Sequence, residues 1–456
     1  MKAAPLLTAL LAGVALAYPG MDLKKLMADV AGTPAPAPAP DATMPDPDTH
    51  RGGRGGRGGG RGGGGGGDRG GGDRGGDRGG GGRGGGGGGG GPSTELIGDL
   101  LTLENRELSP TGTDIKAILV GQAPGQDFRA SYDGEELPPK NSPECGQDEC
   151  CIWKYIADDM NQQMVGDAGR CNSIARGAIR LGFHDAAAWS KNSGGTGADG
   201  SIILANECKT RDENKGLEQI CDVMEGWYKK YRKYRVTMAD MIQMAANVAT
   251  VSCPLGPRVR TFVGRRDTTN PAPENLIPSP FDSSDALFKL FAEKSFTPDG
   301  LAALLGAHST SQQRFVDPRR AGAPQDSTPG TWDIAFYQQT LNPNAPAAVF
   351  KFQSDINVST DPRTAEVWKM FADGRRGQFE WNEAYAAEYV RMSLLGVPNI
   401  NDLTECTKSL PPFRKEFEQP DQDILDKIMS AVIDSPIVQD ALEKGNKLTS
   451  SLLSLH

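Results

Sequence analysis

Histidine is scarce in this chain, and only four of its 456 residues are histidine. His50 lies in an N-terminal tail that is expected to be disordered, and His456 is the last residue. Only His184 and His308 therefore lie where a folded core is expected. The eight cysteines also lack the repeated close spacing that is typical of zinc sites.

Long apolar runs are absent as well. No stretch after the N-terminus approaches the roughly 20 apolar residues that a membrane-spanning helix needs. The N-terminus has a positive Lys2, a short apolar run from Ala3 and a small-residue ending at Ala15-Leu16-Ala17. This pattern is typical of a secretory signal peptide. We expect residues 1–17 to be removed and the mature protein to be extracellular, with no membrane partner.

Residues 51–91 contain almost only glycine, arginine and aspartate. Eight arginines and three aspartates give this tract a charge of about +5, so the rest carries about −14 of the net charge of −9. Such a tract cannot offset the entropy lost on ordering its backbone. Together with the Pro/Ala-rich residues 33–49, it predicts a flexible tail over 18–92. It is either a solvated spacer or an RNA-binding segment. Because Phe and Tyr are missing, we favour the spacer and expect no nucleic-acid partner.

All eight cysteines lie between Cys145 and Cys406. An even number confined to one segment suits four disulfides in an oxidising compartment. Neighbouring Cys150 and Cys151 are poorly placed to bridge each other. Eight cysteines allow on the order of a hundred pairings, so composition alone leaves the pairing open.

Apolar residues recur at helical spacing from residue 150 onward, and few stretches alternate like strands. The sequence therefore predicts a mainly α fold, with an N-terminal extension over 93–144, a domain over 145–415 and a C-terminal extension over 416–456. A short helical pattern covers Leu96–Leu103, and one amphipathic helix is expected over Ile424–Leu442. The helices predicted between them are Lys154–Met164, Ile174–Ser190, Leu217–Lys230, Thr237–Val251, Ser284–Lys294, Thr297–His308, Thr331–Leu341, Asp361–Asp373 and Trp381–Leu394.

The first internal histidine lies in Arg180-Leu181-Gly182-Phe183-His184-Asp185. Positions four apart share a helix face, so Arg180 and His184 project together, with Phe183 nearby. A lone histidine on an apolar helix is more often a core residue. An arginine and a histidine on one apolar face both need partners, which favours a function. A neutral imidazole beside a permanent cation suits peroxide chemistry, as a base and a charge stabiliser.

The second histidine ends a predicted helix that Thr297 caps and Pro298 opens. Leu301, Leu304 and His308 share a face of this helix. Gly306 and Ala307, just before the histidine, would let a flat ligand approach the backbone. This pattern suits a proximal haem ligand, although the signal is weak without the first motif.

With both motifs in place, the chain resembles the secreted fungal (class II) haem peroxidases, from about Cys145 to Phe413. The resemblance implies a two-lobed helical fold that holds haem b between a distal and a proximal helix. It implies a distal group of Arg180, Phe183 and His184, and His308 as the iron ligand. Asp355 matches the carboxylate that accepts the proximal imidazole N–H. Glu207 and Asn214 resemble the relay that orients the distal histidine.

The resemblance also implies two calcium sites, one beside each histidine. Taken alone, each cluster of oxygen-bearing residues is more simply a polar turn. Next to the two histidines, the clusters become the hard oxygen set that Ca²⁺ prefers. The distal ligands implied are Asp185, Gly197, Asp199 and Ser201. The proximal ligands implied are Ser309, Asp326, Thr328, Thr331 and Asp333.

The family pattern orders the cysteines as Cys145–Cys151, Cys150–Cys406 and Cys171–Cys253, which leaves Cys208–Cys221 as an additional bridge. Three features depart from the pattern. Gln325 stands where Phe is usual beneath the haem. Ala303 replaces the surface Trp of lignin-attacking members. The positions of manganese-binding carboxylates are occupied by Ser173, Gly177 and Arg314.

These observations predict a secreted, monomeric enzyme that reduces hydrogen peroxide and oxidises small phenolic or aromatic donors at the haem edge. One alternative is a peroxidase-like domain without turnover that serves in adhesion or in RNA and polyanion binding through its tail. Another is a haem enzyme that uses peroxide for a narrower oxidation. The intact Arg180, His184 and Asp355 set disfavours the inactive alternative.

Overall fold

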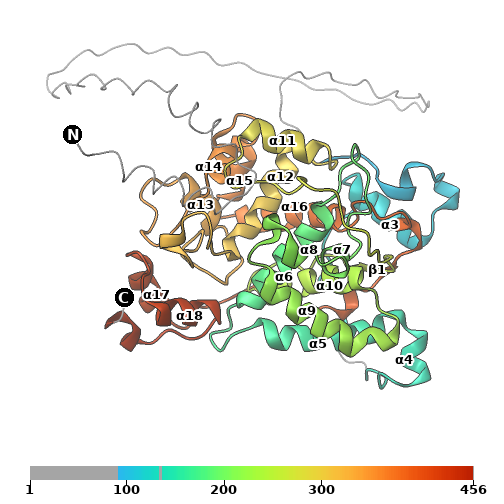
Figure 1. The fold of residues 1–456 in the computed structure, drawn as a ribbon, viewed down its shortest axis with the longest axis horizontal. Helices are drawn as coiled ribbons and strands as arrows, with labels where there is room; N and C mark the ends of the chain where they lie inside the picture. The colour runs from blue at the N-terminus through green and yellow to red at the C-terminus, as the bar shows by residue number, and fades with distance from the viewer. Residues whose placement is uncertain (1–90, 133–135, 455–456) are drawn as a thin grey trace, which may run out of the picture. The chain divides into compact units, whose positions relative to one another are not determined.

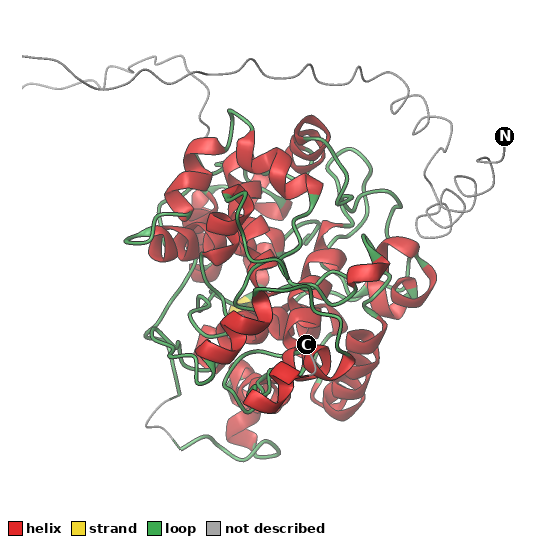
Figure 2. Cartoon of the chain, turned by 90° about the vertical axis from the view of Figure 1, so that its left-hand side faces the viewer, coloured by secondary structure: helices red, strands yellow, loops and turns green. Residues whose placement is uncertain are grey.

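The computed structural model describes residues 91–132 and 136–454, and the expected signal peptide and tail lie outside these residues. The described residues belong to one compact unit that is built almost entirely from helices (Figure 1). Within the described ranges, the only strands are β1 (Phe262–Val263) and β2 (Thr404–Glu405), which pair antiparallel (Figure 2). The mainly α fold expected from the sequence is confirmed.

The helices have definite bounds along the chain. The α-helices are α3 (Pro110–Leu119), α4 (Pro143–Gln147), α5 (Glu149–Met164), α6 (Ser173–Ala187), α7 (Ser201–Leu204), α8 (Glu207–Thr210), α9 (Glu218–Tyr231), α10 (Met238–Ser252), α11 (Ser284–Ala292), α12 (Pro298–Leu305), α13 (Ala335–Leu341), α14 (Gln353–Thr360), α15 (Ala365–Phe371), α16 (Gly377–Met392), α17 (Gln422–Met429) and α18 (Pro436–Glu443). The 3₁₀ turns are η1 (Gly98–Leu101), η2 (Asn105–Glu107), η3 (Asp212–Asn214), η4 (Arg232–Tyr234), η5 (Gly306–Thr310), η6 (Pro318–Arg320), η7 (Ile400–Asp402), η8 (Thr407–Ser409) and η9 (Ser450–Ser454).

Helix α6, which carries His184, and helix α12, which precedes His308, begin at side-chain caps. Asn172 accepts hydrogen bonds from the backbone N–H groups of Ile174 and Ala175 at the start of α6. Thr297 accepts one from Gly300 at the start of α12, where Pro298 is the first helical residue. Such caps satisfy backbone donors that have no partner inside the helix, so these helices begin where the sequence predicts.

Helix α10 is the centre of the fold, because every one of its residues is buried. It packs against α5, α6 and α9, which form one group of helices. Helix α12 instead packs against α11, α14, α15 and α16. The helices with the two histidine motifs therefore belong to different groups, and α16 contacts both α6 and α12.

Four disulfides tie these elements together, and their pairing is the one that the family resemblance implies. The pairs are Cys145–Cys151, Cys150–Cys406, Cys171–Cys253 and Cys208–Cys221. Since Cys150 and Cys151 bridge to different partners, the start of α5 is linked both to α4 and to the chain beyond α16.

The C-terminal extension differs from the expectation, because the single helix predicted over Ile424–Leu442 is wrong. The structure has two helices here, α17 and α18, with Ser435 and Pro436 at the start of the second. A proline lacks the N–H that a continuing helix needs and restricts the residue before it, so the apolar pattern is interrupted at this point. The sequence did not predict α3, α14 or the short helices α4, α7 and α8.

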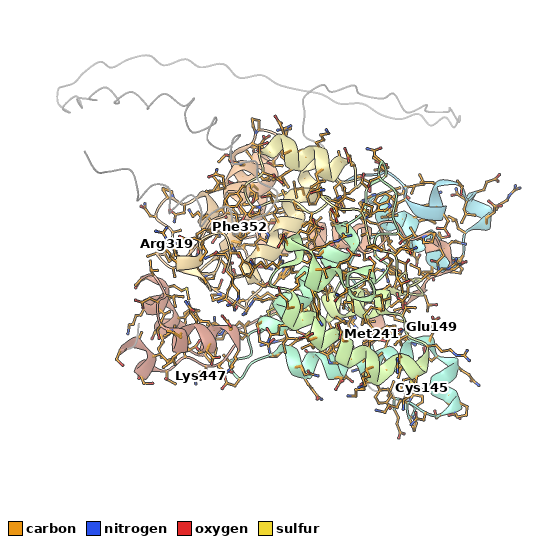
Figure 3. All side chains as sticks on the ribbon, in the orientation of Figure 1. Cys145, Glu149, Met241, Arg319, Phe352 and Lys447 are labelled. Atoms are coloured by element: carbon orange, nitrogen blue, oxygen red, sulfur yellow. A yellow bond between two sulfur atoms is a disulfide. The ribbon has the colours of Figure 1, made fainter. Side chains whose placement is uncertain are left out.

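A buried ion pair joins the C-terminal extension to the rest of the unit. Both guanidinium Nη atoms of Arg170 donate to the carboxylate of Asp421 at 2.8 Å, and both side chains are fully buried. Helices α17 and α18 also enclose a small core of their own, which includes Leu425, Ile428 and Val438. In Figure 1 these helices lie at the lower left, and Figure 3 labels Lys447 there.

Candidate active site

His184 is buried on α6, with a separate partner for each ring nitrogen. Its Nδ1 lies 2.9 Å from Oδ1 of Asn214, while Nδ2 of Asn214 donates to the carbonyl of Glu207 at 3.1 Å. This second bond fixes the amide orientation, so Oδ1 faces the imidazole and must accept a hydrogen from Nδ1. The neutral ring therefore carries its proton on Nδ1 and presents a lone pair on Nε2.

The guanidinium of Arg180 lies against that lone pair. Its Nε donates to Nε2 of His184 at 3.2 Å, and its Nη1 donates to the carbonyl of Lys215 at 3.0 Å. The ring of Phe183 meets the imidazole edge-on at 5.6 Å between centroids and stacks on Phe291. The structure thus brings together the three residues of the Arg-Phe-His motif as helical spacing predicts.

The environment of His184 keeps its imidazole neutral. The pKa of His184 is lowered from 6.5 to about 3, mainly by burial and also by the positive charge of Arg180. The hydrogen bond to Asn214 acts in the opposite direction. A buried, uncharged imidazole with a lone pair on Nε2 can act as a base at neutral pH.

Glu207 takes part in this arrangement in a different way from a carboxylate relay. Its backbone carbonyl, not its side chain, accepts the hydrogen bond from Asn214. The carboxylate pairs with Arg211 at 2.7 Å and accepts the backbone N–H of Ala272 at 2.9 Å. The side chain of Glu207 therefore secures the loop around Asn214. The sequence could not reveal which group of this residue faces Asn214.

His308 follows α12 and has one firmly held ring nitrogen. Its Nδ1 lies 3.1 Å from the carboxylate of Asp355, which is fully buried at the start of α14. The rings of Phe336 and Phe352 stand edge-on to the imidazole at 5.7 and 5.5 Å. Figure 3 labels Phe352, which lies in the part of the molecule that α12 to α15 build.

The local structure around His308 corrects two expectations from the sequence. Helix α12 ends at Leu305, so His308 lies in the 3₁₀ turn η5 and not on the α-helix. Gly306 does not leave room for a flat ligand. A Cβ atom at this position would come within 2.3 Å of the indole of Trp381 and 2.4 Å of the Tyr337 hydroxyl. The glycine is needed because aromatic side chains pack against the backbone there.

The residues around His308 fit a haem iron. With Nδ1 held by Asp355, the ring can offer Nε2 to a metal, and Nε2 has no hydrogen-bond partner within residues 91–132 and 136–454. The side chain of His308 is 31% exposed although its neighbours Ser309 and Thr310 are buried. A partly open imidazole between two phenylalanine rings suits a large apolar group with a metal at its centre.

A direct contact joins the segments that carry the two histidines. Arg176, one turn before Arg180 on α6, donates to the side-chain oxygen of Gln312 at 2.7 Å. Gln312 lies four residues after His308. The same guanidinium donates to the carbonyl of Glu443 in α18, whose carboxylate pairs with Arg314 at 2.5 Å. The C-terminal extension therefore spans both segments on this side.

The predicted distal calcium ligands lie together beside His184. Asp185 accepts the N–H groups of Gly200 and Ile202, and Asp199 accepts that of Ser201. Burial raises the pKa of Asp185 well above its usual value, and the negative charge of Asp199 raises it further. Two buried carboxylates that repel each other provide the charge that a divalent cation would neutralise.

The predicted proximal ligands also lie together. Asp326 and Thr331 each have a buried side-chain oxygen, Oδ2 and Oγ1, that lacks a partner within the described residues. Burial and the charge of Asp333 raise the pKa of Asp326, and burial raises the pKa of Asp333 to about 6. The Ser309 hydroxyl donates to the Thr331 carbonyl, and Thr328 donates to Asp326. Oxygens without partners beside paired carboxylates fit a Ca²⁺ ion.

Within the residues that the structure describes, three or more His, Cys, Asp or Glu side chains nowhere converge as a metal site. Each calcium candidate instead rests on two carboxylates with hydroxyl and backbone oxygens.

None of the helices in the described ranges is long and apolar enough to cross a bilayer.

The structure shows the surroundings of residues that depart from the family pattern. Ala303 is buried, with its carbonyl accepting hydrogen bonds from Trp381 and Tyr337. A Cβ at Gly177 would lie 3.0 Å from Ile220, which leaves little room for a longer side chain. Gln325 is buried, its Oε1 accepts the Ser311 hydroxyl, and its Nε2 has no partner within the described residues.

Comparison with known proteins agrees with this geometry. Residues 159–374 match the family model described as Peroxidase. Ligninase C of Trametes versicolor is 32% identical over 287 residues, which cover 58% of this chain and 75% of that protein. Manganese peroxidase 3 of Phlebia radiata is 32% identical over 58% of this chain and 77% of that protein. A peroxidase of Arthromyces ramosus is 30% identical over 58% of this chain and 76% of that protein.

The matched region contains His184, His308, the Asp355 carboxylate and four of the eight cysteines. The relatives carry this similarity over about three quarters of their own length. The chain is therefore a peroxidase-family enzyme, and it belongs to the class II fungal haem peroxidases.

Proposed function

We propose that this chain is a secreted peroxidase that reduces hydrogen peroxide at a haem held by His308 and oxidises small phenolic or aromatic donors. The observation that carries the proposal is the hydrogen-bonded set Glu207 carbonyl, Asn214, His184 and Arg180, which fixes a neutral base beside a cation. The four disulfides support export into an oxidising compartment.

The distal residues would move the proton. Nε2 of His184 would accept a proton from peroxide and then deliver it to the departing oxygen. Peroxide must first replace the 3.2 Å hydrogen bond between Arg180 and Nε2. Arg180, once released, would stabilise the negative charge that develops on the departing oxygen. Phe183 would close the apolar wall next to the imidazole.

The proximal residues would hold the cofactor and adjust its electronics. Asp355 accepts the Nδ1 hydrogen of His308, which gives the imidazole anionic character and makes it a stronger donor. The haem, when bound, supplies the iron at which peroxide is reduced. Phe336 and Phe352 hold the imidazole plane between them.

Two Ca²⁺ ions would stabilise the segments that bear the histidines. Asp185 and Ser309 directly follow His184 and His308, so a cation at either cluster is coupled to the adjacent ring. Each ion would neutralise a buried pair, Asp185 with Asp199 and Asp326 with Asp333. The calcium sites would therefore stabilise both the fold and the positions of the two imidazoles.

The donor preference follows from what the haem edge offers. Arg314 is a cation that would repel Mn²⁺, and the carboxylate of Glu443 is already paired with it. Ala303 is buried and cannot be oxidised to a radical. A small aromatic donor would therefore transfer its electron by direct contact with the haem edge.

One experiment tests the proposed function. The absorption spectrum of the exported protein is recorded before and after one equivalent of peroxide, and turnover of a small phenol is then measured. We expect a haem Soret band, a spectral change on adding peroxide, and a return to the starting spectrum when the phenol is added. A protein that binds haem but neither responds to peroxide nor oxidises the phenol would overturn the proposal.

A further inference from the structure

Behind the helix before His308, aromatic side chains form an unbroken series of ring contacts. The members share nearly complete burial and centroid distances of 4.6 to 5.6 Å to the next ring. They are Phe336, Trp368, Tyr337, Trp381, Trp332, Tyr385 and Tyr389. Three of the six tryptophans of the chain are in this series, which we call the aromatic series.

The aromatic series begins at the proximal histidine. Phe336 stands edge-on to the imidazole of His308 at 5.7 Å. Trp381 approaches the backbone even more directly, because its indole occupies the space that a side chain at Gly306 would need. Gly306 is two residues from His308, so this indole lies against the same turn that holds the imidazole.

The aromatic series ends at the distal helix. Tyr385 and Tyr389 stack at 5.6 Å, and the hydroxyl of Tyr389 donates to Gln243 at 3.2 Å. A Cβ atom at Gly182 would lie 2.3 Å from that hydroxyl. Gly182 is two residues before His184. The rings therefore connect the backbone beside one histidine to the backbone beside the other.

Two indoles at the middle of the aromatic series are stacked face to face. Trp332 and Trp381 have centroids 4.9 Å apart and planes inclined by only 2°. Both are fully buried, and the edge of Tyr385 meets Trp332 at 4.6 Å. Among the aromatic side chains, an indole is the one most readily oxidised without losing a proton, and two stacked rings can share a positive charge. Burial keeps such a charge away from water and from other molecules.

The indole N–H groups point to acceptors that cannot take a proton. Nε1 of Trp332 donates to the amide oxygen of Asn382 at 3.1 Å, and Nε1 of Trp381 donates to the carbonyl of Ala303 at 3.0 Å. Amide oxygens are not bases at neutral pH. An oxidised indole here would keep its proton, and the two hydrogen bonds would stabilise the positive charge.

We propose that the stacked pair Trp332 and Trp381 is a second oxidisable centre, which supplies an electron to the peroxidase site when donors are scarce. The inference rests on the proposed function, because the site must hold haem beside His308. Its role would be protective, since an oxidising equivalent on the stacked pair is kept from reacting at random side chains.

Reduction of one peroxide to two waters consumes two electrons and two protons, which two donor molecules normally supply. When donors are absent, the stacked pair gives one of these electrons and becomes a radical cation, while its indole protons stay in place. The haem would supply the other electron, and solvent the two protons. Two phenols that arrive later return both electrons, each loses its own proton to solvent, and the pair and the haem are restored.

The experiment uses the full-length enzyme with its haem. The protein is mixed with one equivalent of peroxide without a donor, frozen within seconds, and examined by electron paramagnetic resonance. A sample that contains ring-deuterated tryptophan is treated in the same way. We expect an organic radical whose spectrum narrows with the deuterated tryptophan, since hyperfine coupling to deuterium is smaller.

Two variants locate the radical. Trp332→Phe and Trp381→Phe keep a ring in the core, and their acceptors retain a second donor in Gln378 and in the Tyr337 hydroxyl. Each variant should lose the tryptophan signal and survive fewer additions of peroxide without a donor. Trp227→Phe is the matched control, because Trp227 is buried on α9 and makes none of these ring contacts. It should keep both the signal and the survival of the parent protein.

The outcomes separate this inference from the proposed function. The inference is overturned if phenol turnover is normal but no organic radical forms, or if deuterated tryptophan leaves the spectrum of the radical unchanged. Either result leaves the proposed function intact. The deuterium test needs no variant, so it decides the question even if a substituted protein folds poorly. A radical that persists in both variants likewise places the oxidised residue elsewhere.

Discussion

The Nδ1 atom of His184 lies 2.9 Å from Oδ1 of Asn214, and the other end of that amide is bound to the Glu207 carbonyl. A backbone carbonyl thus determines, through one side chain, which nitrogen of the imidazole carries the proton. The proton therefore stays on Nδ1 as long as the loop that carries Glu207 keeps its conformation. Arg211, Ala272 and the disulfide Cys208–Cys221 hold this loop in place.

Asn214→Ala should slow the reaction with peroxide while leaving haem bound. Without Oδ1, the imidazole loses the acceptor that keeps the proton on Nδ1 and the lone pair on Nε2. General base catalysis contributes about 100-fold or more, so the loss should fall between about 10-fold and 100-fold. Stopped-flow absorption measures it. Asn344→Ala, at an exposed turn, is the control, and equal rates in both variants would contradict the role of Asn214.

Substitution of His308 should impair haem binding, whereas substitution of His184 should impair the reaction with peroxide. His308→Ala removes the iron ligand, so the purified protein should contain little haem or show altered axial ligation. His184→Ala should retain haem but react with peroxide about 100-fold or more slowly, since it lacks the base. Haem content and stopped-flow rates distinguish the cases. A His184→Ala protein with parental rates would be incompatible with the assignment.

The peroxide reaction should be independent of pH from neutrality down to about pH 4. The pKa of His184 is lowered to about 3, mainly by burial and also by Arg180, so its base form persists across this range. In Asn214→Asp a carboxylate replaces the amide and favours the imidazolium, which should move the acid limb of the rate profile to higher pH. An acid limb near pH 6.5 in the parent protein would show that His184 is not held neutral.

The same shift predicts how stability depends on pH. The folded pKa of His184 lies below the unfolded value of 6.5, so the unfolded chain binds one more proton between about pH 3 and 6.5. The contribution of His184 is fully present above pH 6.5 and decreases as pH falls. Relative to His184→Gln, the free energy of unfolding should decline by about 1.4 kcal/mol more per pH unit within this range. Urea unfolding of both proteins measures the difference, and identical slopes would contradict it.

Removal of calcium should destabilise the protein and disturb the iron. Saturation with a ligand at about 100 times its Kd stabilises a protein by about 2.7 kcal/mol, so chelation should lower the Tm by several degrees. Asp326→Ala should have a similar effect that added Ca²⁺ does not reverse. Asp434→Ala, at an exposed position in the C-terminal extension, is the control. An unchanged Tm and iron spectrum after exhaustive chelation would refute both calcium sites.

The sequence by itself determined the local features of this protein. Side-chain spacing along a helix depends only on helix geometry, so Arg180, Phe183 and His184 could be placed on one side of α6 in advance. The predicted cap at Thr297 is also local, because it involves residues within one turn. The family pattern then supplied the disulfide pairs and the partner Asp355, which spacing alone could not provide.

Only the tertiary structure decided features that depend on distant segments. Gly306 was expected to admit a flat ligand, but Trp381, 75 residues later, packs against it. The carbonyl of Glu207, rather than its carboxylate, meets Asn214, because Arg211 and Ala272 bind the side chain. The stacking of Trp332 on Trp381 and the pairing of Arg314 with Glu443 were likewise invisible in the sequence. Such contacts arise from the packing of whole helices, which no short sequence window contains.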